Sequence, residues 1–321
     1  MFEKLKRNLL ISIAAAGILY LAFTIFADFR HVAEAFSNFH WLLLPVLLLC
    51  SMCNYLVRFS KWDYYLRLIN INISKVDSLL VFMSGLVMSV TPGKMGELLK
   101  AYLVKQLTNT QISKTVPIIF VERITDFVAL MIIALVGAYY YNYGRTIVLS
   151  ISFFFFIVIV FLSNRKIALP VLKLLEKNRF LNKHLAKIHN AYESSYQMLQ
   201  PAPLIKMTVV SLASWFFECL GYYLILINFP VKINITLLWS AFSYCFAIIV
   251  GAVSMLPGGL GVTEGSLTFM LVQKGVTVQY AVATTFIIRA VTLWFAVLVG
   301  VVSVSIYQRR FGKISFEPER S

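Results

Sequence analysis

Charged residues are scarce in this chain of 321 residues. Asp, Glu, Lys and Arg together make up 13% of it, whereas hydrophobic residues make up 60% and the mean hydropathy is +0.80. Soluble domains are about 45–50% apolar, so this composition excludes an ordinary water-soluble fold. It predicts instead a protein that is embedded in a membrane over most of its length, without a soluble catalytic domain.

Histidine and cysteine are also rare, with four of each. The histidines show no spacing typical of metal ligands, and no Ser-His-Asp or Cys-His set can be assembled in the apolar segments. The cysteines lie within apolar runs, where Cys packs as a small hydrophobic side chain. We therefore expect no metal site, no cofactor and no hydrolase chemistry.

Apolar segments of the length of a membrane helix recur along the chain. They cover residues 8–27, 41–57, 116–141, 147–162, 204–229, 237–256 and 280–306. A helix needs about 20 apolar residues to cross the bilayer, so most of these segments are predicted to be spanning helices. The first begins like a signal peptide but is too long for one, and it is predicted to be an uncleaved helix.

The net charge of +15 is distributed unevenly between alternate connections. Most of the 29 Lys and Arg fall in segments 4–7, 58–75, 105–114, 165–206 and 309–320, whereas the intervening connections carry only Arg30, Arg145, Lys232 and Lys274. By the positive-inside rule the basic segments face the cytoplasm. Both termini are therefore predicted to be cytoplasmic, which requires an even number of crossings.

Two apolar segments are interrupted by Pro-Gly turns. Segment 78–104 turns at T-P-G-K-M-G-E (91–97) between flanks of cytoplasmic type, and segment 237–272 turns at L-P-G-G-L-G-V-T-E (256–264) between flanks with few charges. Each is predicted to be a re-entrant helical hairpin, the first entering from the cytoplasmic side and the second from the outer side. Non-helical backbone at membrane depth requires a surrounding cavity.

The two turns share the pattern P-G-x-x-G, and an arginine follows each at nearly the same distance, Arg123 and Arg289. We therefore predict an all-α polytopic fold of one domain over residues 1–321, with six full crossings and two hairpins in an inverted-topology repeat. The first repeat covers 1–144 and the second 145–321. The basic insertion at 164–203 is either an amphipathic helix on the cytoplasmic leaflet or a solvated loop.

Each returning half-helix begins with unpaired N–H groups directed into the predicted cavity, which favours an anion there. Lys94, beside the first turn, adds a cation suited to phosphate. Glu97 and Glu264 lie near the starts of the two returning helices. They either cap these helices or bind a cation or a headgroup amine.

Three ionisable residues, Glu122, Arg123 and Asp126, interrupt an otherwise apolar helix. Charges inside a membrane helix are expensive and by default mark a substrate pathway or a paired network. The alternative is that these side chains reach the cytoplasmic interface by snorkelling.

Isolated cations occur on two further helices. Arg289 has no acidic residue in its own turn, so its partner is expected elsewhere, with Glu264 and Glu218 as the candidates. Arg58 and Lys61, with Trp62, lie at a predicted cytoplasmic helix end, where they are expected to be interface anchors.

The predicted substrate site combines the two turns with these charged residues. Its members are Pro92, Gly93, Lys94, Gly96, Glu97, Glu122, Arg123, Asp126, Pro257, Gly258, Gly259, Gly261, Glu264 and Arg289.

The two turn motifs, together with E-R-I-T-D at 122–126, resemble the lysylphosphatidylglycerol synthase transmembrane-region family over nearly the whole chain. Members with a C-terminal soluble transferase domain attach an amino acid to phosphatidylglycerol, and their membrane domain is associated with flipping the lipid product. The resemblance implies only this flippase-like part, because the chain stops at Ser321. It also implies a bacterial or archaeal cytoplasmic (inner) membrane.

The leading hypothesis is a translocase, not an enzyme, that binds an anionic lipid or polyprenyl-phosphate-linked headgroup between the two hairpin tips. One alternative is an intramembrane lipid-modifying transferase that uses Glu122 or Asp126 as its general base. The other is an accessory subunit that binds a lipid- or glycan-pathway enzyme through 164–203. The expected partners are a membrane lipid, such an enzyme and a second copy of this chain, but not nucleic acid.

Overall fold

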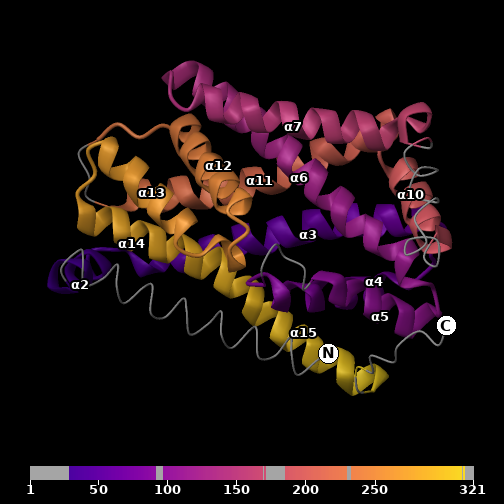
Figure 1. Ribbon diagram of the computed structural model, residues 1–321. Helices are drawn as coiled ribbons and strands as arrows, with labels where there is room; N and C mark the ends of the chain where they lie inside the picture. The colour runs from indigo at the N-terminus through magenta and orange to yellow at the C-terminus, as the bar shows by residue number, and fades with distance from the viewer. Residues whose placement is uncertain are drawn as a thin grey trace.

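The computed structural model describes residues 29–91, 97–168, 170, 185–229, 233–312 and 314. These residues are predominantly helical and include no β-strand (Figure 1). The predicted first helix at 8–27 and most of the first turn, including Pro92, Gly93, Lys94 and Gly96, lie outside the described residues.

The described residues form a series of helices. They are α2 (Phe29–Ser37), α3 (Leu44–Leu68), α4 (Lys75–Gly85), α5 (Leu99–Thr108), α6 (Ile112–Tyr141), α7 (Arg145–Ser163), α10 (Leu185–Met198), α11 (Pro201–Asn228), α12 (Leu237–Val253), α13 (Val262–Gln273), α14 (Val278–Arg289) and α15 (Phe295–Phe311). Short 3₁₀ turns occur at Trp41–Leu43, Leu86–Met88 and Pro257–Gly259, and a π-helical turn, Ala290–Trp294, joins α14 to α15.

Four described segments are long and apolar enough to cross a membrane: Trp41–Leu68, Arg145–Ser163, Pro201–Asn228 and Val278–Phe311. Helix α7 shows the membrane character most clearly, because Val148 is its one buried residue and Phe153 and Phe154 are exposed. An exposed surface of this kind is stable against hydrocarbon and not against water. The chain is therefore a polytopic integral membrane protein.

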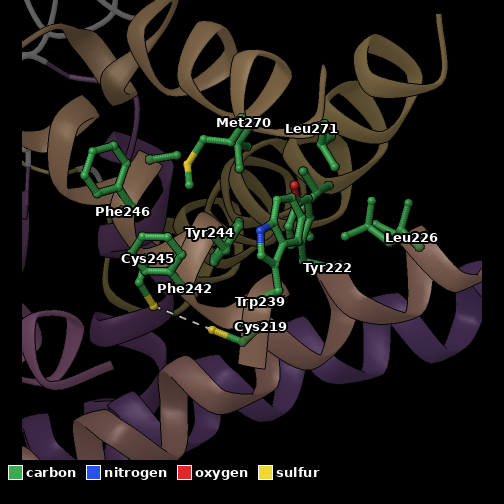
Figure 2. Close-up of a cluster of buried hydrophobic side chains, with 14 of the residues drawn as sticks. Cys219, Tyr222, Leu226, Trp239, Phe242, Tyr244, Cys245, Phe246, Met270 and Leu271 are labelled. Atoms are coloured by element: carbon green, nitrogen blue, oxygen red, sulfur yellow. Dashed lines mark hydrogen bonds between the residues drawn. The ribbon is translucent and has the colours of Figure 1, made fainter. Parts of the chain in front are cut away.

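Helices α3, α6 and α11 form the centre of the bundle, with α7 along one edge and α15 along the opposite edge (Figure 1). Helix α12 packs against α6 and α11 of the centre, and α13 packs against α12 and α14. Figure 2 shows the aromatic core that holds them, in which Trp239, Phe242 and Tyr244 of α12 lie near Tyr222 of α11 and Met270 of α13. This core fixes α12, and with it the turn that follows.

The turn between α12 and α13 adopts the conformation that its glycines allow. Gly258, Gly259 and Gly261 have φ values of 59°, 67° and 85°, which side chains with a Cβ rarely adopt. The turn lies against the end of the other hairpin: a Cβ placed on Gly258 would be 3.5 Å from the Cα of Val90. The described ends of the two Pro-Gly segments therefore meet inside the bundle.

The crossing expected at 280–306 lies within the candidate membrane span Val278–Phe311, in which residues 290–294 are π-helical. Side chains of α3 bond to the carbonyls of this turn. The hydroxyl of Ser51 donates to the carbonyl oxygen of Val291 at 2.6 Å, and that of Tyr55 donates to the carbonyl oxygen of Thr292 at 2.7 Å. Such turns often occur at functional sites, and this one directly follows Arg289.

Gly300 of α15 is expected to be intolerant of a side chain. A Cβ at this position would overlap the backbone N and Cα of Val87, and backbone atoms cannot move aside cheaply. We expect Gly300→Ala to lower the free energy of unfolding by about 1–3 kcal/mol. Thermal unfolding in detergent measures this change, with size-exclusion chromatography as the readout of the folded fraction.

The matched control is Gly221→Ala on α11, where the nearest atom to an added Cβ is 3.9 Å away. Because Ala favours helix over Gly by roughly 1 kcal/mol, this variant should be neutral or slightly stabilised. Equal unfolding temperatures for the two variants would contradict the assigned contact between α15 and the 3₁₀ turn.

Candidate functional site

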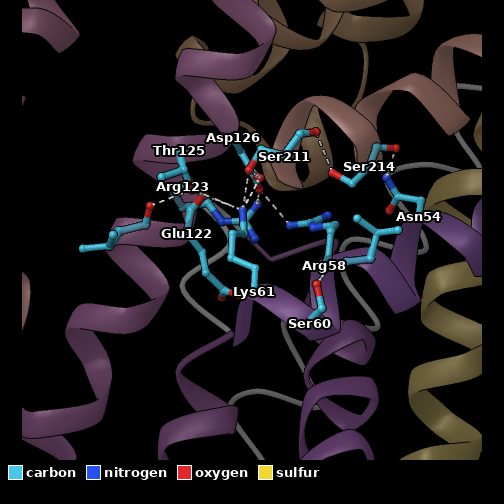
Figure 3. A network of polar contacts seen from close by, with 12 residues as sticks. Asn54, Arg58, Ser60, Lys61, Glu122, Arg123, Thr125, Asp126, Ser211 and Ser214 are labelled. Carbon is cyan, nitrogen blue, oxygen red and sulfur yellow. Dashed lines mark hydrogen bonds and ion pairs between the residues drawn. The ribbon is translucent and has the colours of Figure 1, made fainter. Parts of the chain in front are cut away.

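Asp126 lies at the centre of a buried polar network between α3, α6 and α11 (Figure 3). Its Oδ1 accepts hydrogen bonds from Nζ of Lys61 at 2.5 Å and from the hydroxyl of Ser211 at 3.0 Å. Its Oδ2 accepts from the guanidinium of Arg58 at 3.0 Å. The carboxylate thus pairs with two cations of α3 where water is excluded, and its single negative charge is shared between them.

A second group of ion pairs joins α5 to α6. Nζ of Lys100 lies 2.6 Å from the carboxylate of Glu122 and 3.6 Å from that of Glu97. Glu97 also accepts from the guanidinium of Arg123 at 3.0 Å, and Arg123 lies 3.5 Å from Asp126. Glu97, Glu122 and Asp126 are therefore linked through shared cations.

One expectation and one alternative for these residues are wrong. Lys61 is completely buried and the side chain of Arg58 is 12% exposed, so they are not interface anchors. Glu122 and Asp126 are likewise buried, which excludes snorkelling for these two residues. The reason is that cations of α3 and α5 pack against α6, where Arg58 and Lys61 bond to Asp126 and Lys100 pairs with Glu122.

Arg289 binds the turn of the second half. Its Nε lies 2.7 Å from Oε1 of Glu264, and its terminal nitrogen donates to the carbonyl oxygen of Gly258 at 2.5 Å. The other oxygen of Glu264 accepts from the N–H of Gly261 at 2.7 Å, at the start of α13. Glu264, one of the two predicted partners of Arg289, is thus confirmed, and it also caps α13.

Glu218, the other candidate, lies on α11 and accepts a hydrogen bond from the hydroxyl of Tyr244 at 2.7 Å. It faces the same space as Arg289, because both residues line one cavity.

This cavity has a volume of about 200 Å³ and lies between the described ends of the two Pro-Gly segments. Its charged lining consists of Arg58, Arg123, Asp126, Glu218 and Arg289. Three guanidinium groups and two carboxylates give the lining one positive charge in excess when all are ionised. The rest is largely apolar, so an ion in the cavity would interact strongly with these groups.

The predicted site residues divide into three sets. Those that line the cavity are Arg123, Asp126, Gly258, Gly259 and Arg289. Glu97, Glu122, Pro257, Gly261 and Glu264 lie in the ion pairs or in the turn around it. Pro92, Gly93, Lys94 and Gly96 lie outside the described residues.

Sequence reasoning missed four charged members of this arrangement: Arg58, Lys61 and Lys100 as network residues, and Glu218 as a cavity residue. A usable signal exists for Lys100, which follows Glu97 by three positions and so shares its helical face. Across the described residues, no group of three or more His, Cys, Asp or Glu side chains could hold a metal ion.

These features define a class: a polytopic membrane protein whose helices enclose compensated charges around a cavity next to broken helices. The chain belongs to the family described as lysylphosphatidylglycerol synthase TM region, whose family model matches residues 9–300. The resemblance inferred from the motifs is thereby confirmed.

Similar proteins are known in archaea. A UPF0104 membrane protein of Methanocaldococcus jannaschii is 28% identical over 236 residues, which cover 70% of this chain and 95% of that protein. A UPF0104 membrane protein of Pyrococcus horikoshii is 24% identical over 324 residues, covering 92% of this chain and 96% of the relative. The similarity thus extends over nearly the full length of both relatives.

Proposed function

We propose that this protein is a flippase-like translocase for an anionic lipid or lipid-linked substrate, and that the substrate's headgroup binds in the cavity between the two Pro-Gly segments. The observation that carries the proposal is the convergence of Arg58, Arg123 and Arg289 on one cavity inside the bundle. Charged side chains at membrane depth are expensive, and by default they serve a substrate pathway.

The chemistry of the lining favours a phosphate. Guanidinium groups match the geometry of phosphate oxygens and can bind them through two parallel hydrogen bonds. Arg123 and Arg289 each have a carboxylate partner, Glu97 and Glu264 respectively, so neither cation depends on a ligand for its compensation. A phosphate can therefore exchange with a carboxylate, which allows the headgroup to be released as well as bound.

The topology we propose is the inverted repeat 1–144 and 145–321, with six crossings, two re-entrant hairpins and both termini on the cytoplasmic side of the cell membrane. It is supported by ion pairs at matching positions in the two halves. Glu97–Arg123 and Glu264–Arg289 each join the residues after a Pro-Gly turn to the next long helix. Broken helices at matching positions are typical of secondary transporters, in which one repeat moves against the other.

Replacement of the cavity arginines tests this proposal. Arg123→Ala and Arg289→Ala should each lower transport of fluorescent phosphatidylglycerol across proteoliposome membranes at least tenfold. Each removes a charged hydrogen-bond donor to the phosphate, which contributes roughly 1.5–3 kcal/mol to the binding free energy. Native mass spectrometry of the purified protein should show the loss of a co-purified anionic lipid. Wild-type transport by both variants would exclude the site.

Arg165→Ala is the matched control. Arg165 pairs with Glu193 at 2.5 Å, but its side chain is 47% exposed and it does not line the cavity. This variant should transport lipid at the wild-type rate, because an exposed ion pair contributes little.

The transferase alternative is disfavoured by the ion pairs. Its two candidate bases, Glu122 and Asp126, are held by the ammonium groups of Lys100 and Lys61, respectively. A carboxylate held in such a pair must break it before it can accept a proton from a substrate. The accessory-subunit alternative predicts that deleting the basic insertion removes function while lipid binding survives.

A further inference from the structure

A second hollow opens on the side of the bundle, between α6, α7 and α10. This lateral groove has a volume of about 560 Å³ and is almost entirely apolar. Its walls include Phe120 and Ile124 of α6, Phe155 and Val158 of α7, and Ile188 of α10. Phe120 is 53% exposed, so the groove is accessible from the outside of the bundle.

The groove and the central cavity share two lining residues, Arg123 and Phe127. These residues are four positions apart on α6 and therefore lie on the same face of the helix. The Phe127 ring stacks on Phe155 of α7, with centroids 4.5 Å apart and an angle of 19° between the ring planes. The Phe127–Phe155 pair and the guanidinium of Arg123 thus lie at the boundary between the central cavity and the lateral groove.

We propose that the groove holds a hydrocarbon chain of the same lipid whose phosphate binds in the central cavity, with the chain passing beside Phe127. This inference rests on the proposed function. The groove carries Arg123 at its inner end and offers almost no other polar contact, so the chain of a lipid with a phosphate at Arg123 fits both spaces at once. The adjoining helix α7 is largely exposed along its length, as expected for a helix that faces lipid.

The arrangement gives the substrate a lateral route. The headgroup moves into the cavity past Arg123 while the chain stays in contact with apolar side chains of α6 and α7. A water-soluble phosphate compound would leave the groove empty, so the substrate class assigned here is a lipid phosphate.

Photo-cross-linking tests the groove directly. The protein is reconstituted into nanodiscs containing phosphatidic acid with a diazirine in one acyl chain, irradiated and digested, and the labelled residues are identified by mass spectrometry. We expect label at groove residues such as Phe120, Phe155 and Val158, and excess unlabelled phosphatidic acid should suppress it. Label on outward residues such as Phe153 and Phe154 should not be suppressed, because bulk lipid contacts them.

A groove-filling variant and its control complete the experiment. Val158→Trp places a large ring in the groove and should lower the suppressible label at least fivefold. Ile157→Trp, on the neighbouring exposed position of α7, should leave it unchanged. The elution profiles of both variants on size-exclusion chromatography report whether they are folded.

The outcomes separate this inference from the proposed function. If phosphatidic acid is retained by the wild type and lost in Arg123→Ala, but no groove residue carries suppressible label, the chain site is wrong and the headgroup site stands. If retention of phosphatidic acid does not depend on Arg123, both the headgroup site and the chain site are overturned.

Discussion

Replacing Asp126 by alanine is expected to lower the free energy of unfolding by about 3–5 kcal/mol, because the change leaves buried cations without their carboxylate. Asp126 accepts from Lys61, Arg58 and Ser211, and Arg123 lies 3.5 Å from it. Lys61 is completely buried and cannot reach water. The fraction of monodisperse protein after heating in detergent measures the loss.

Two further variants show whether the effect comes from the buried charge. Glu193→Ala removes a carboxylate from the exposed pair with Arg165. This variant should lower the free energy of unfolding by less than about 1 kcal/mol. In the background of Asp126→Ala, the additional change Lys61→Met removes the most deeply buried cation and should recover part of the stability. An unchanged unfolding temperature in Asp126→Ala would show that Asp126 does not compensate these cations.

Much of the arrangement around the second turn could be predicted from the sequence. Gly258, Gly259 and Gly261, close to Pro257, indicate a tight, non-helical turn, and all three have positive φ values. A lone arginine in an apolar helix must have a partner, and the chain offers few acids. Elimination therefore left Glu264 and Glu218 as the two candidates, because acidic residues are scarce, and the structure pairs Arg289 with Glu264.

The network around Asp126 could not be predicted in the same way. Lys61 and Asp126 are separated by 65 positions, and their contact depends on how α3 and α6 are rotated against each other. The positive-inside rule places a basic residue at a helix end near the interface, which is correct on average and wrong for Arg58 and Lys61. The π-helical turn after Arg289 is also invisible in the sequence, because the apolar pattern continues through it without a break.

The two halves differ in how their carboxylates are compensated. Glu97 is shared between Arg123 and Lys100, whereas Glu264 joins Arg289 to the backbone of its own turn. The second pair therefore fixes the position of a turn as well as that of a cavity arginine. Loss of Glu264 should affect folding and transport together.

Glu264→Gln and Glu264→Ala are expected to separate these two roles. Gln keeps an oxygen that can accept a hydrogen bond from the N–H of Gly261. It removes the negative charge that faces Arg289, which should lower the free energy of unfolding by about 3 kcal/mol. Ala also removes the hydrogen bond to the N–H of Gly261 and should lower the free energy of unfolding by roughly 1 kcal/mol more. Both variants should lose most of their transport, because Arg289 is held in the cavity partly by this carboxylate. Thermal unfolding and proteoliposome transport are measured side by side.

Asp77→Asn provides the comparison at an ion pair that is open to water on its arginine side. Asp77 also lies in the first turn of a helix, and its carboxylate is 3.0 Å from Arg310, whose side chain is 51% exposed. Because water solvates this arginine, Asp77→Asn should lower the free energy of unfolding by less than about 1 kcal/mol and leave transport unchanged. If Glu264→Gln were as stable and as active as Asp77→Asn, the charge of Glu264 would be dispensable, and capping of α13 would be its remaining role.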